Sequence, residues 1–216
     1  MRTRWQLIVA ALFCLITGFT VGAHAANAAD KPSSILVIGD SLSAEYGLQR
    51  GSGWVNLIQK RLDDAGLAWR INNASISGDT TSGGLSRFPD ALERHKPDIV
   101  IIELGSNDAL RGLSLDMTRS NLAGMVEQAK AAGSRVVLVG MQIPPNYGRQ
   151  YTEAFKTLFE DLAKAKHVAL VPFLLDGIAT DRSLFQADGI HPNESAQPVL
   201  ANNVWKALEA LVTARP

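Results

Sequence analysis

The sequence predicts an α/β domain of three layers, in which helices cover both faces of a parallel β-sheet. Short apolar runs alternate with longer amphipathic runs from about residue 34 to the end of the chain. The short runs lack alternating polar residues, which is typical of strands buried on both faces. Glycine or polar residues follow these runs and mark the expected strand ends.

Five segments have the length and composition of buried strands. The third contains the run Ile-Val-Ile-Ile, and the fourth contains Val-Val-Leu-Val. Such β-branched runs favour strands, because these side chains pack well on a pleated surface. The predicted strands are 34–38, 69–73, 98–104, 135–139 and 168–171.

The segments between these strands show the apolar spacing of helices. Trp54, Val55, Ile58 and Leu62 fit one helical face after the first strand. The other predicted helices are 115–132 with Gly133 as a stop signal, 151–166, and 196–212 with Pro198 in its first turn. No repeat or linker interrupts residues 34–216, so one domain is expected.

The N-terminal 28 residues have the three parts of a secretory signal peptide. Arg2 and Arg4 precede an almost wholly apolar run over residues 7–21, and small residues at 23–28 fit a signal peptidase. The run is shorter than the ~20 residues that span a bilayer, so cleavage is favoured over a retained anchor. We therefore predict a signal peptide at 1–28, a catalytic domain at 29–216, a periplasmic location and no membrane insertion after cleavage.

Composition excludes several kinds of function. The chain has 216 residues, with 21 basic and 21 acidic side chains, and it has no basic run that would bind nucleic acid. Its single cysteine, Cys14, falls within the predicted signal peptide. The mature chain is therefore expected to use no thiol chemistry, disulfide or thiolate metal site.

A serine and a late histidine form the first candidate site. Ser41 follows the first strand, and Asp188 precedes His191 by three residues near the C-terminus. A serine becomes a nucleophile when a histidine takes its proton and a carboxylate orients that histidine. His95 and His167 lie in charged connections and are interpreted as surface residues.

Two further strand ends carry candidate oxyanion donors. Gly78 follows the second strand and Asn107 follows the third. With the strand order 2-1-3-4-5, the topological switch point lies between the first and third strands, and such folds bind ligands at that point. There the Gly78 N–H, the Asn107 amide and the Ser41 N–H could together stabilise a developing oxyanion.

A metal site is the main alternative. Asp40, Asp79 and Asp108 all follow strands, and with Asp188 and His191 they could bind a divalent metal of a phosphoesterase. Each aspartate also has an ordinary role as a turn or cap residue, which weakens this hypothesis. A binding protein without catalytic activity is a third possibility, because fold alone does not fix function.

These segments together resemble the SGNH hydrolase superfamily, also called GDSL esterases. The four letters of that name fall in order on Ser41, Gly78, Asn107 and His191. The resemblance is closer to the bacterial acyl-CoA thioesterase I / lysophospholipase / arylesterase family, and it covers nearly the whole mature chain. It is carried by residues 38–44, 73–80, 100–111, 138–147, 151–155 and 187–193.

The resemblance implies a flavodoxin-like fold and an exported serine esterase of broad specificity. It implies Ser41 as nucleophile, His191 as general base, Asp188 as its partner, and Ser41, Gly78 and Asn107 as the oxyanion hole. No metal or cofactor is expected, and the partner is a small ester or thioester acted on by a monomer.

The pocket and two departures from the family pattern give further expectations. Leu110 and Ile143 lie in loops after the third and fourth strands, where an apolar wall of the substrate pocket is expected. Glu45, expected beside the site entrance, stands where relatives often have a small residue, and Ser106 replaces a glycine that is frequent before Asn107 in the family. They bear on chain-length preference.

Overall fold

The five predicted strands form one parallel sheet in the computed structural model, which describes residues 32–214. The order is β2-β1-β3-β4-β5, as expected for a flavodoxin-like sheet. The strands are β1 (Ser33–Gly39), β2 (Trp69–Asn73), β3 (Ile99–Glu103), β4 (Arg135–Val139) and β5 (Ala169–Val171). The predicted signal peptide, residues 1–28, lies outside the described residues.

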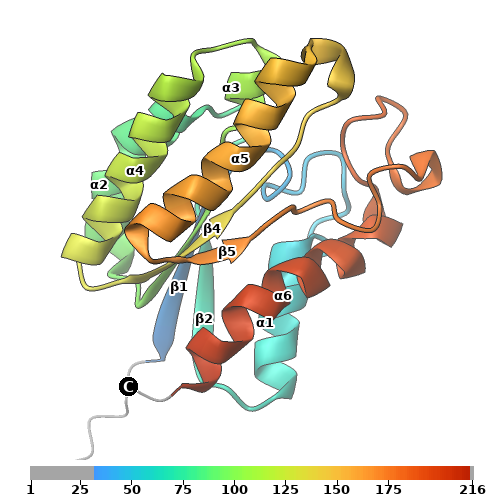
Figure 1. The fold of residues 1–216 in the computed structure, drawn as a ribbon. Helices are drawn as coiled ribbons and strands as arrows, with labels where there is room; N and C mark the ends of the chain where they lie inside the picture. Colours follow the sequence, from blue (N-terminus) through green and yellow to red (C-terminus); the bar gives the residue numbers. More distant parts are fainter. Residues whose placement is uncertain (1–31, 215–216) are drawn as a thin grey trace, which may run out of the picture. The chain divides into compact units, whose positions relative to one another are not determined.

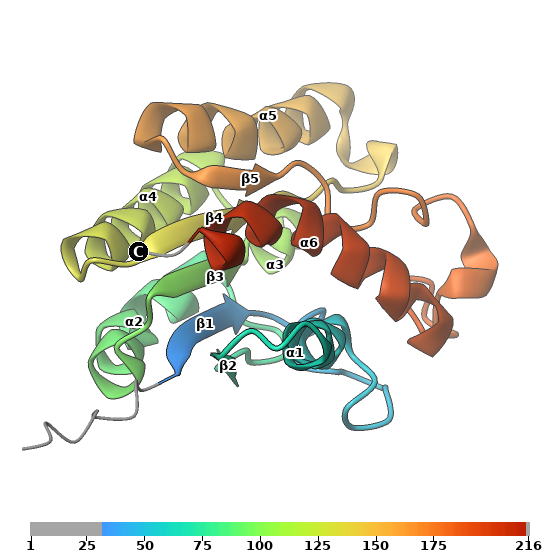
Figure 2. The same ribbon diagram turned by 90° about the horizontal axis from the view of Figure 1, so that it is seen from below.

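Helices form a layer on each face of this sheet (Figures 1 and 2). Helices α1 and α6 lie together on one face, and α2, α4 and α5 lie on the other. The bounds are α1 (Trp54–Asp64), α2 (Thr81–His95), α3 (Ser106–Leu110), α4 (Leu115–Ala131), α5 (Arg149–Lys166) and α6 (Gln197–Thr213). The three-layer fold predicted from the sequence is therefore confirmed.

The core lies on both sides of the central strands. All residues of β3 are buried, and residues 35–38 of β1 are fully inaccessible to solvent. Each such Ile, Leu or Val side chain stabilises the fold by ~1.5–3 kcal/mol relative to an exposed one. The helix layer on one face adds the rings of Phe155 and Phe159, which meet edge to face at 5.2 Å.

Two helices were not predicted as separate elements. Helix α2 buries only Thr81, Gly84 and Phe88, and its two glycines and Pro89 are poor helix formers, which obscures the helix in the sequence. Its first turn is instead fixed by Thr80, whose side chain accepts a hydrogen bond from the Gly83 N–H. Helix α3 has only five residues, too few to show a periodic pattern.

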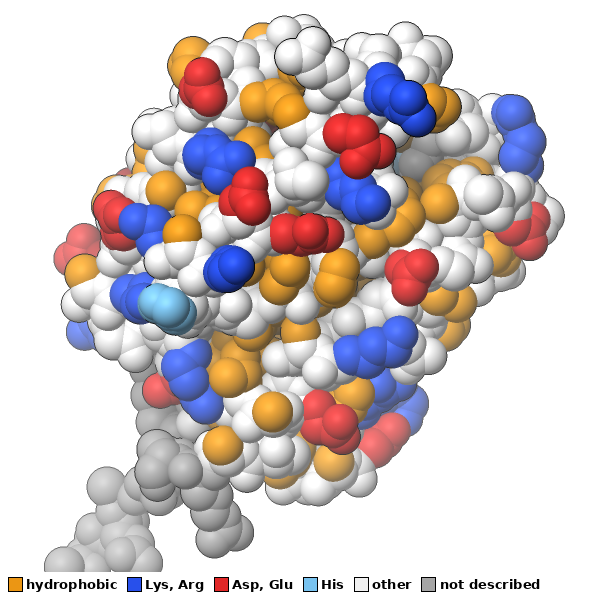
Figure 3. Space-filling view, viewed as in Figure 1, with side chains coloured by type: hydrophobic (Ala, Val, Ile, Leu, Met, Phe, Trp, Pro, Cys, Tyr) orange, Lys and Arg blue, Asp and Glu red, His pale blue; other side chains and the backbone are white. Residues whose placement is uncertain are grey.

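The described surface is mixed in charge. Lys and Arg side chains alternate with Asp and Glu on the face seen in Figure 3.

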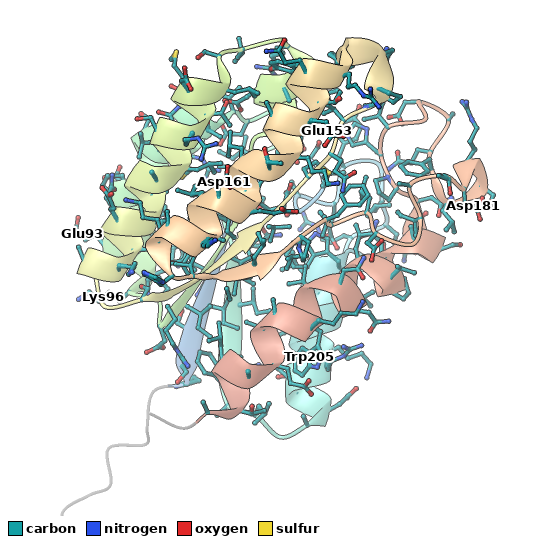
Figure 4. All side chains as sticks on the ribbon, in the orientation of Figure 1. Glu93, Lys96, Glu153, Asp161, Asp181 and Trp205 are labelled. Atoms are coloured by element: carbon teal, nitrogen blue, oxygen red, sulfur yellow. The ribbon has the colours of Figure 1, made fainter. Side chains whose placement is uncertain are left out.

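Polar contacts connect neighbouring helices on each face of the sheet. In Figure 4, Asp161 lies on α5, and its carboxylate is 3.7 Å from Arg119 of α4. Trp205 lies on α6, and the guanidinium of Arg61 from α1 stacks on its ring. Within residues 32–214, no helix has both the length and the apolar composition needed to cross a bilayer.

Gly39, the last residue of β1, leaves room for two buried polar side chains. A Cβ at this position would lie 2.7 Å from Ser43 Oγ and 2.8 Å from Glu103 Oε2. We expect Gly39→Ala to lower the free energy of unfolding by ~1–3 kcal/mol, the usual cost of overpacking. Urea denaturation of the two proteins measures this change.

Gly124 provides the matched control for that substitution. It lies within α4, and a Cβ there would make only an ordinary contact at 3.4 Å with Leu85. Gly124→Ala should therefore raise the free energy of unfolding by ~0.5–1 kcal/mol, because alanine is the better helix former. Equal effects of the two substitutions would show that the crowding at Gly39 has no energetic consequence.

Candidate active site

The structure brings the three predicted catalytic residues into one hydrogen-bonded chain. Ser41 lies just beyond the carboxyl end of β1, and its Oγ is 2.9 Å from His191 Nε2. The other ring nitrogen, Nδ1, is 2.7 Å from Asp188 Oδ2. Serine, imidazole and carboxylate are thus connected in the order that nucleophilic catalysis requires.

A tight turn fixes the carboxylate of Asp188. Its Oδ1 accepts hydrogen bonds from the backbone N–H groups of Ile190 at 2.9 Å and His191 at 3.0 Å. Gly189 allows this turn by adopting a φ of +66°. These hydrogen bonds, led by the His191 N–H, lower the pKa of Asp188 to about 2, so the carboxylate is ionised at neutral pH.

Gln186 connects the Asp188–His191 turn to the loop after Ser41. Its backbone N–H donates to the His191 carbonyl at 2.7 Å. Its side-chain amide donates to the carbonyls of Tyr46 at 2.8 Å and Pro192 at 3.2 Å. The Gln186 side chain therefore connects the segment that carries Ser41 to the segment that carries His191.

Two further hydrogen bonds hold the same pair of segments. The Gln49 N–H donates to Glu194 Oε1 at 3.1 Å, and the Trp54 N–H donates to Gln197 Oε1 at 3.0 Å. Gln197 is almost fully buried, and its oxygen satisfies an N–H in the first turn of α1 that has no partner within the helix. The juxtaposition of distant segments is thus built from specific polar contacts.

An aromatic ring lies against the imidazole. The rings of Tyr46 and His191 are 4.5 Å apart between centroids and tilted by 41°. Tyr46 remains half exposed at the mouth of the site. Sequence reasoning missed Tyr46 and Gln186, because nothing in a single sequence shows which distant residue they contact.

Two predicted oxyanion donors have unused backbone N–H groups. Within residues 32–214, neither the Ser41 N–H nor the Gly78 N–H donates a hydrogen bond. Gly78 has a φ of +79°, and its carbonyl accepts from Arg111 at 2.8 Å. A side chain at this position would be strained, which agrees with the presence of glycine.

Asn107 differs from the expected free donor. Its Nδ2 donates to Asp40 Oδ2 and to the Asp79 carbonyl, both at 3.0 Å. Both amide hydrogens are therefore in use before any substrate is bound. Binding an oxyanion requires Asn107 to share or exchange one of these bonds, a tightening that is common when a substrate enters a site.

Two aspartates of the alternative metal site, Asp79 and Asp108, each interact with a different side chain. Asp79 forms an ion pair with Arg87 at 2.8 Å. Asp108 accepts hydrogen bonds from the N–H and the hydroxyl of Thr81. Among the described residues, no group of three or more histidine, cysteine, aspartate or glutamate side chains is arranged to hold a metal ion.

A cavity of about 670 Å³ opens beside Ser41 and His191. Leu110 and Ile143, the residues expected in an apolar wall, both line it. Sequence reasoning missed most of the remaining apolar wall, which follows β4 and β5 and includes Met141, Phe173, Leu175, Ala179 and Phe185. A volume of this size holds an acyl chain or an aromatic group.

The two departures from the family pattern lie in different surroundings. Glu45 does not line the cavity; its carboxylate accepts hydrogen bonds from the N–H groups of Gly51 and Gly53 and organises that loop. Ser106 does line the cavity and is the first residue of α3. The α3 turn depends on Gly105, whose φ is +120°.

A buried acidic pair behind Ser41 was also missed. Glu103 ends β3, and its Oε2 accepts hydrogen bonds from Ser43 Oγ at 2.7 Å and from the Asp40 N–H at 3.3 Å. Burial, followed by the charge of Asp40, raises the pKa of Glu103 well above its usual value. The only signal in the sequence is an acid at the end of an otherwise apolar strand.

A serine, histidine and aspartate at the switch point of a parallel sheet, beside an apolar cavity, form the constellation of a serine hydrolase. The model of the GDSL-like lipase/acylhydrolase family matches residues 37–197. The chain belongs to this family and is a carboxylic ester hydrolase of the esterase, arylesterase, thioesterase and lysophospholipase group.

Named relatives agree with this membership. The chain is 50% identical to esterase TesA of Pseudomonas aeruginosa, over 83% of this chain and 89% of TesA. It is 39% identical to thioesterase 1/protease 1/lysophospholipase L1 of Escherichia coli K12, over 97% of this chain and 94% of the relative. A crystal structure of TesA matches with a TM-score of 0.81 at 50% identity, covering 83% of this chain and 99% of that one.

Proposed function

We propose that this esterase hydrolyses carboxylic esters and thioesters through an acyl-enzyme formed on Ser41. The observation that carries this proposal is the chain of hydrogen bonds from Asp188 through His191 to Ser41, with distances of 2.7 and 2.9 Å. Ser41, the last residue in this series of hydrogen bonds, lines a cavity that is large enough for the acyl group. Nucleophile, base and acyl site are therefore adjacent.

The reaction proceeds in two halves. Ser41 Oγ attacks the ester carbonyl while His191 Nε2 takes the hydroxyl proton, and the Asp188 carboxylate stabilises the resulting imidazolium. The Ser41 and Gly78 N–H groups and the Asn107 amide receive the oxyanion. The alcohol or thiol leaves with the proton from His191, and a water activated by the same imidazole then releases the acid.

We further propose a broad substrate range. More than half of the residues that line the cavity are apolar, and apolar contacts discriminate only weakly between acyl chains. The polar lining residues outside the proposed catalytic set are Asp40, Ser106, Gln142 and Arg182. Aryl esters, short- and medium-chain acyl esters, lysophospholipids and acyl-CoA thioesters are the proposed substrates. A periplasmic monomer released by cleavage of residues 1–28 remains a prediction.

Chain-length preference should depend on the cavity wall. Leu110 is half buried and faces the cavity. Leu110→Gln is expected to lower kcat/KM for a medium-chain ester, and this loss should be ~10-fold larger than the loss for an acetate ester. The reason is that one or two lost methylene contacts are worth ~10–200-fold in total. Rates on p-nitrophenyl esters of graded length measure the profile.

Leu113 supplies the matched control. It belongs to the loop after α3, is largely exposed and does not line the cavity. Leu113→Gln should leave the chain-length profile unchanged. The same shift in both variants would show that the profile is set by loop stability and would contradict the assigned wall.

The proposed mechanism is tested by covalent labelling and by chelation. The protein should hydrolyse the graded esters, acyl-CoA and lysophospholipid, and an organophosphonate should stop all of these activities as one equivalent attaches to Ser41. EDTA should have no effect. Activity that a chelator removes would favour the metal-dependent phosphoesterase, and binding of esters without turnover would favour a binding protein.

A further inference from the structure

Two acidic side chains, Asp40 and Glu103, lie together behind the turn that carries Ser41. Asp40 is 1% exposed and Glu103 is 2% exposed. Glu103 is in register with Gly39, the neighbour of Asp40, across the β1–β3 pair. Within residues 32–214, no ion pair includes either carboxyl group. Two buried, adjacent carboxyl groups cannot both be ionised cheaply, so the pair retains a proton.

The hydrogen bonds assign that proton to Glu103. Both oxygens of Asp40 already act as acceptors, from the Leu42 N–H and from Asn107 Nδ2, each at 3.0 Å. Within residues 32–214, Glu103 accepts hydrogen bonds only on Oε2, from Ser43 Oγ and from the Asp40 N–H, so its Oε1 can carry the proton. Burial, as the largest cause, raises the pKa of Asp40 to about 6, so Asp40 is the ionised member at neutral pH.

Asp40 connects this pair to the reacting atoms. Its Oδ2 holds Asn107, the proposed oxyanion donor, and its Oδ1 holds the backbone directly after Ser41. Glu103 in turn accepts from Ser43 Oγ in the same turn. Glu103 therefore supports the turn that carries Ser41 directly, and it supports the Asn107 donor through Asp40. Asp40 lines the substrate cavity, and Glu103 does not.

We propose that Glu103 is a positioning residue of the active site. In its protonated form it holds the Asp40 N–H and the Ser43 hydroxyl, and it thereby places the turn that carries Ser41 and the Asp40 carboxylate that binds Asn107. This inference rests on the proposed function, because it assigns Asn107 and Ser41 their roles in acyl transfer. It adds a group that neither the triad nor the oxyanion hole includes.

Other charged groups near the pair are accounted for. His191 acts on Asp40 only through its charge, and this interaction favours the carboxylate form of Asp40. Asp79 and Asp108 follow the neighbouring strands; the first is paired with Arg87, and the second is bonded to Thr81. The proton on Glu103 is therefore set mainly by burial and by Asp40.

The first test compares Glu103→Leu with Glu103→Gln. Leucine removes the hydrogen bonds to the Asp40 N–H and the Ser43 hydroxyl, so the Asp40 carboxylate that binds Asn107 is less firmly placed. We expect kcat to fall by ~10–100-fold, below the full loss of an oxyanion donor at ~10²–10³. KM should change by less than ~3-fold, since the lost interaction acts on the transition state. Glutamine imitates a protonated glutamate in shape and donors and should keep kcat within ~5-fold of the natural protein.

The second test follows the proton itself. An infrared carbonyl band of a protonated carboxylic acid should be present at pH 7 and absent from Glu103→Gln. As pH rises far enough to remove the shared proton, kcat of the natural protein should fall, whereas Glu103→Gln should keep its plateau. Above the usual pKa of glutamate, stability should also fall with rising pH in the natural protein and fall less in the glutamine variant, because only the folded state holds the proton.

Ser134→Ala serves as a control for general damage to the core. Ser134, directly before β4, is buried and donates to the carbonyl of Pro97, which precedes β3. Both residues lie at the amino ends of these strands, whereas Ser41 follows the carboxyl end of β1. This variant should lose stability and keep kcat. Equal loss of kcat in Glu103→Leu and Glu103→Gln, full kcat in Glu103→Leu, or no protonated-acid band would each overturn the proposal.

The infrared band and the stability measurement remain readable if Glu103→Leu fails to fold, because both use Glu103→Gln. They also separate this inference from the proposed function. Failure of the proposed function would appear as a natural protein without esterase activity or phosphonate labelling. Failure of the inference alone would leave an active natural protein whose pH profile is the same as that of Glu103→Gln.

Discussion

Replacing Ser41 with alanine should abolish ester hydrolysis, with a loss in kcat of ~10⁴–10⁶-fold, because the proposed acyl-enzyme can no longer form. Among residues 32–214, the Ser41 side chain has His191 as its only hydrogen-bond partner, so the fold should be unaffected. Rates on p-nitrophenyl esters and mass spectrometry after phosphonate treatment measure the two effects. Both turnover and the mass increase should disappear together.

Ser195 is the matched control for this substitution. It is an exposed serine on the same C-terminal segment as His191, and its hydroxyl makes no hydrogen bond within the described part of the chain. Ser195→Ala should keep both activity and labelling. Phosphonate labelling that survives in Ser41→Ala at another serine would remove Ser41 from its assigned role.

Asp188→Asn should lower kcat by ~10²–10⁴-fold, because the amide can favour the tautomer of His191 that cannot accept the serine proton. The carboxylate is 37% exposed, so water can replace part of its effect. Steady-state rates on one activated ester measure the loss. KM should change little, since Asp188 acts on the transition state through the imidazole.

Asp181→Asn is the corresponding control. Asp181 lies in the projecting segment that precedes the Asp188–His191 turn (Figure 4), and its Oδ1 accepts a hydrogen bond from the Ser183 N–H at 3.0 Å. Asparagine is an equally good cap, so kcat should stay within ~2-fold. A comparable loss in Asp181→Asn would mean that acidity in this loop, rather than contact with His191, determines the rate.

The low pKa of Asp188 also predicts a dependence of stability on pH. Its folded-state pKa of about 2 lies below the ordinary 3.8, so the carboxylate contributes stability at pH values above about 4. That contribution is lost as pH falls from about 4 toward 2. Urea denaturation at several pH values should show a smaller acid decline in Asp188→Asn than in the natural protein; identical declines would contradict the assignment.

The strands were the most predictable part of the fold. The predicted segments 69–73 and 135–139 have the same bounds as β2 and β4. In β4, a polar flank and an apolar interior are local signals of a strand buried on both faces. Strand β2, Trp-Arg-Ile-Asn-Asn, lies at the edge of the sheet and is only partly buried. Helix α2 was less visible, because it contains two glycines and Pro89 and buries few apolar residues.

The candidate site was predictable in its residue types and less so in its contacts. Ser41, Asp188 and His191 could be selected because serine hydrolysis needs those three groups, and a local Asp-Gly-Ile-His turn is visible in the sequence. The donor state of Asn107 was not predictable, since its partners Asp40 and Asp79 lie on other strand ends.

The sequence by itself determined the strand and helix pattern, the chemical groups of the site and the family resemblance, because these depend on residue type and local spacing. Only the tertiary structure decided how the two halves of the site are held together through Gln186, and that Glu103 and Asp40 share a buried position behind Ser41. Hydrogen bonding and burial depend on which distant residues become neighbours. That information appears only when the sheet and its helices pack into one structure.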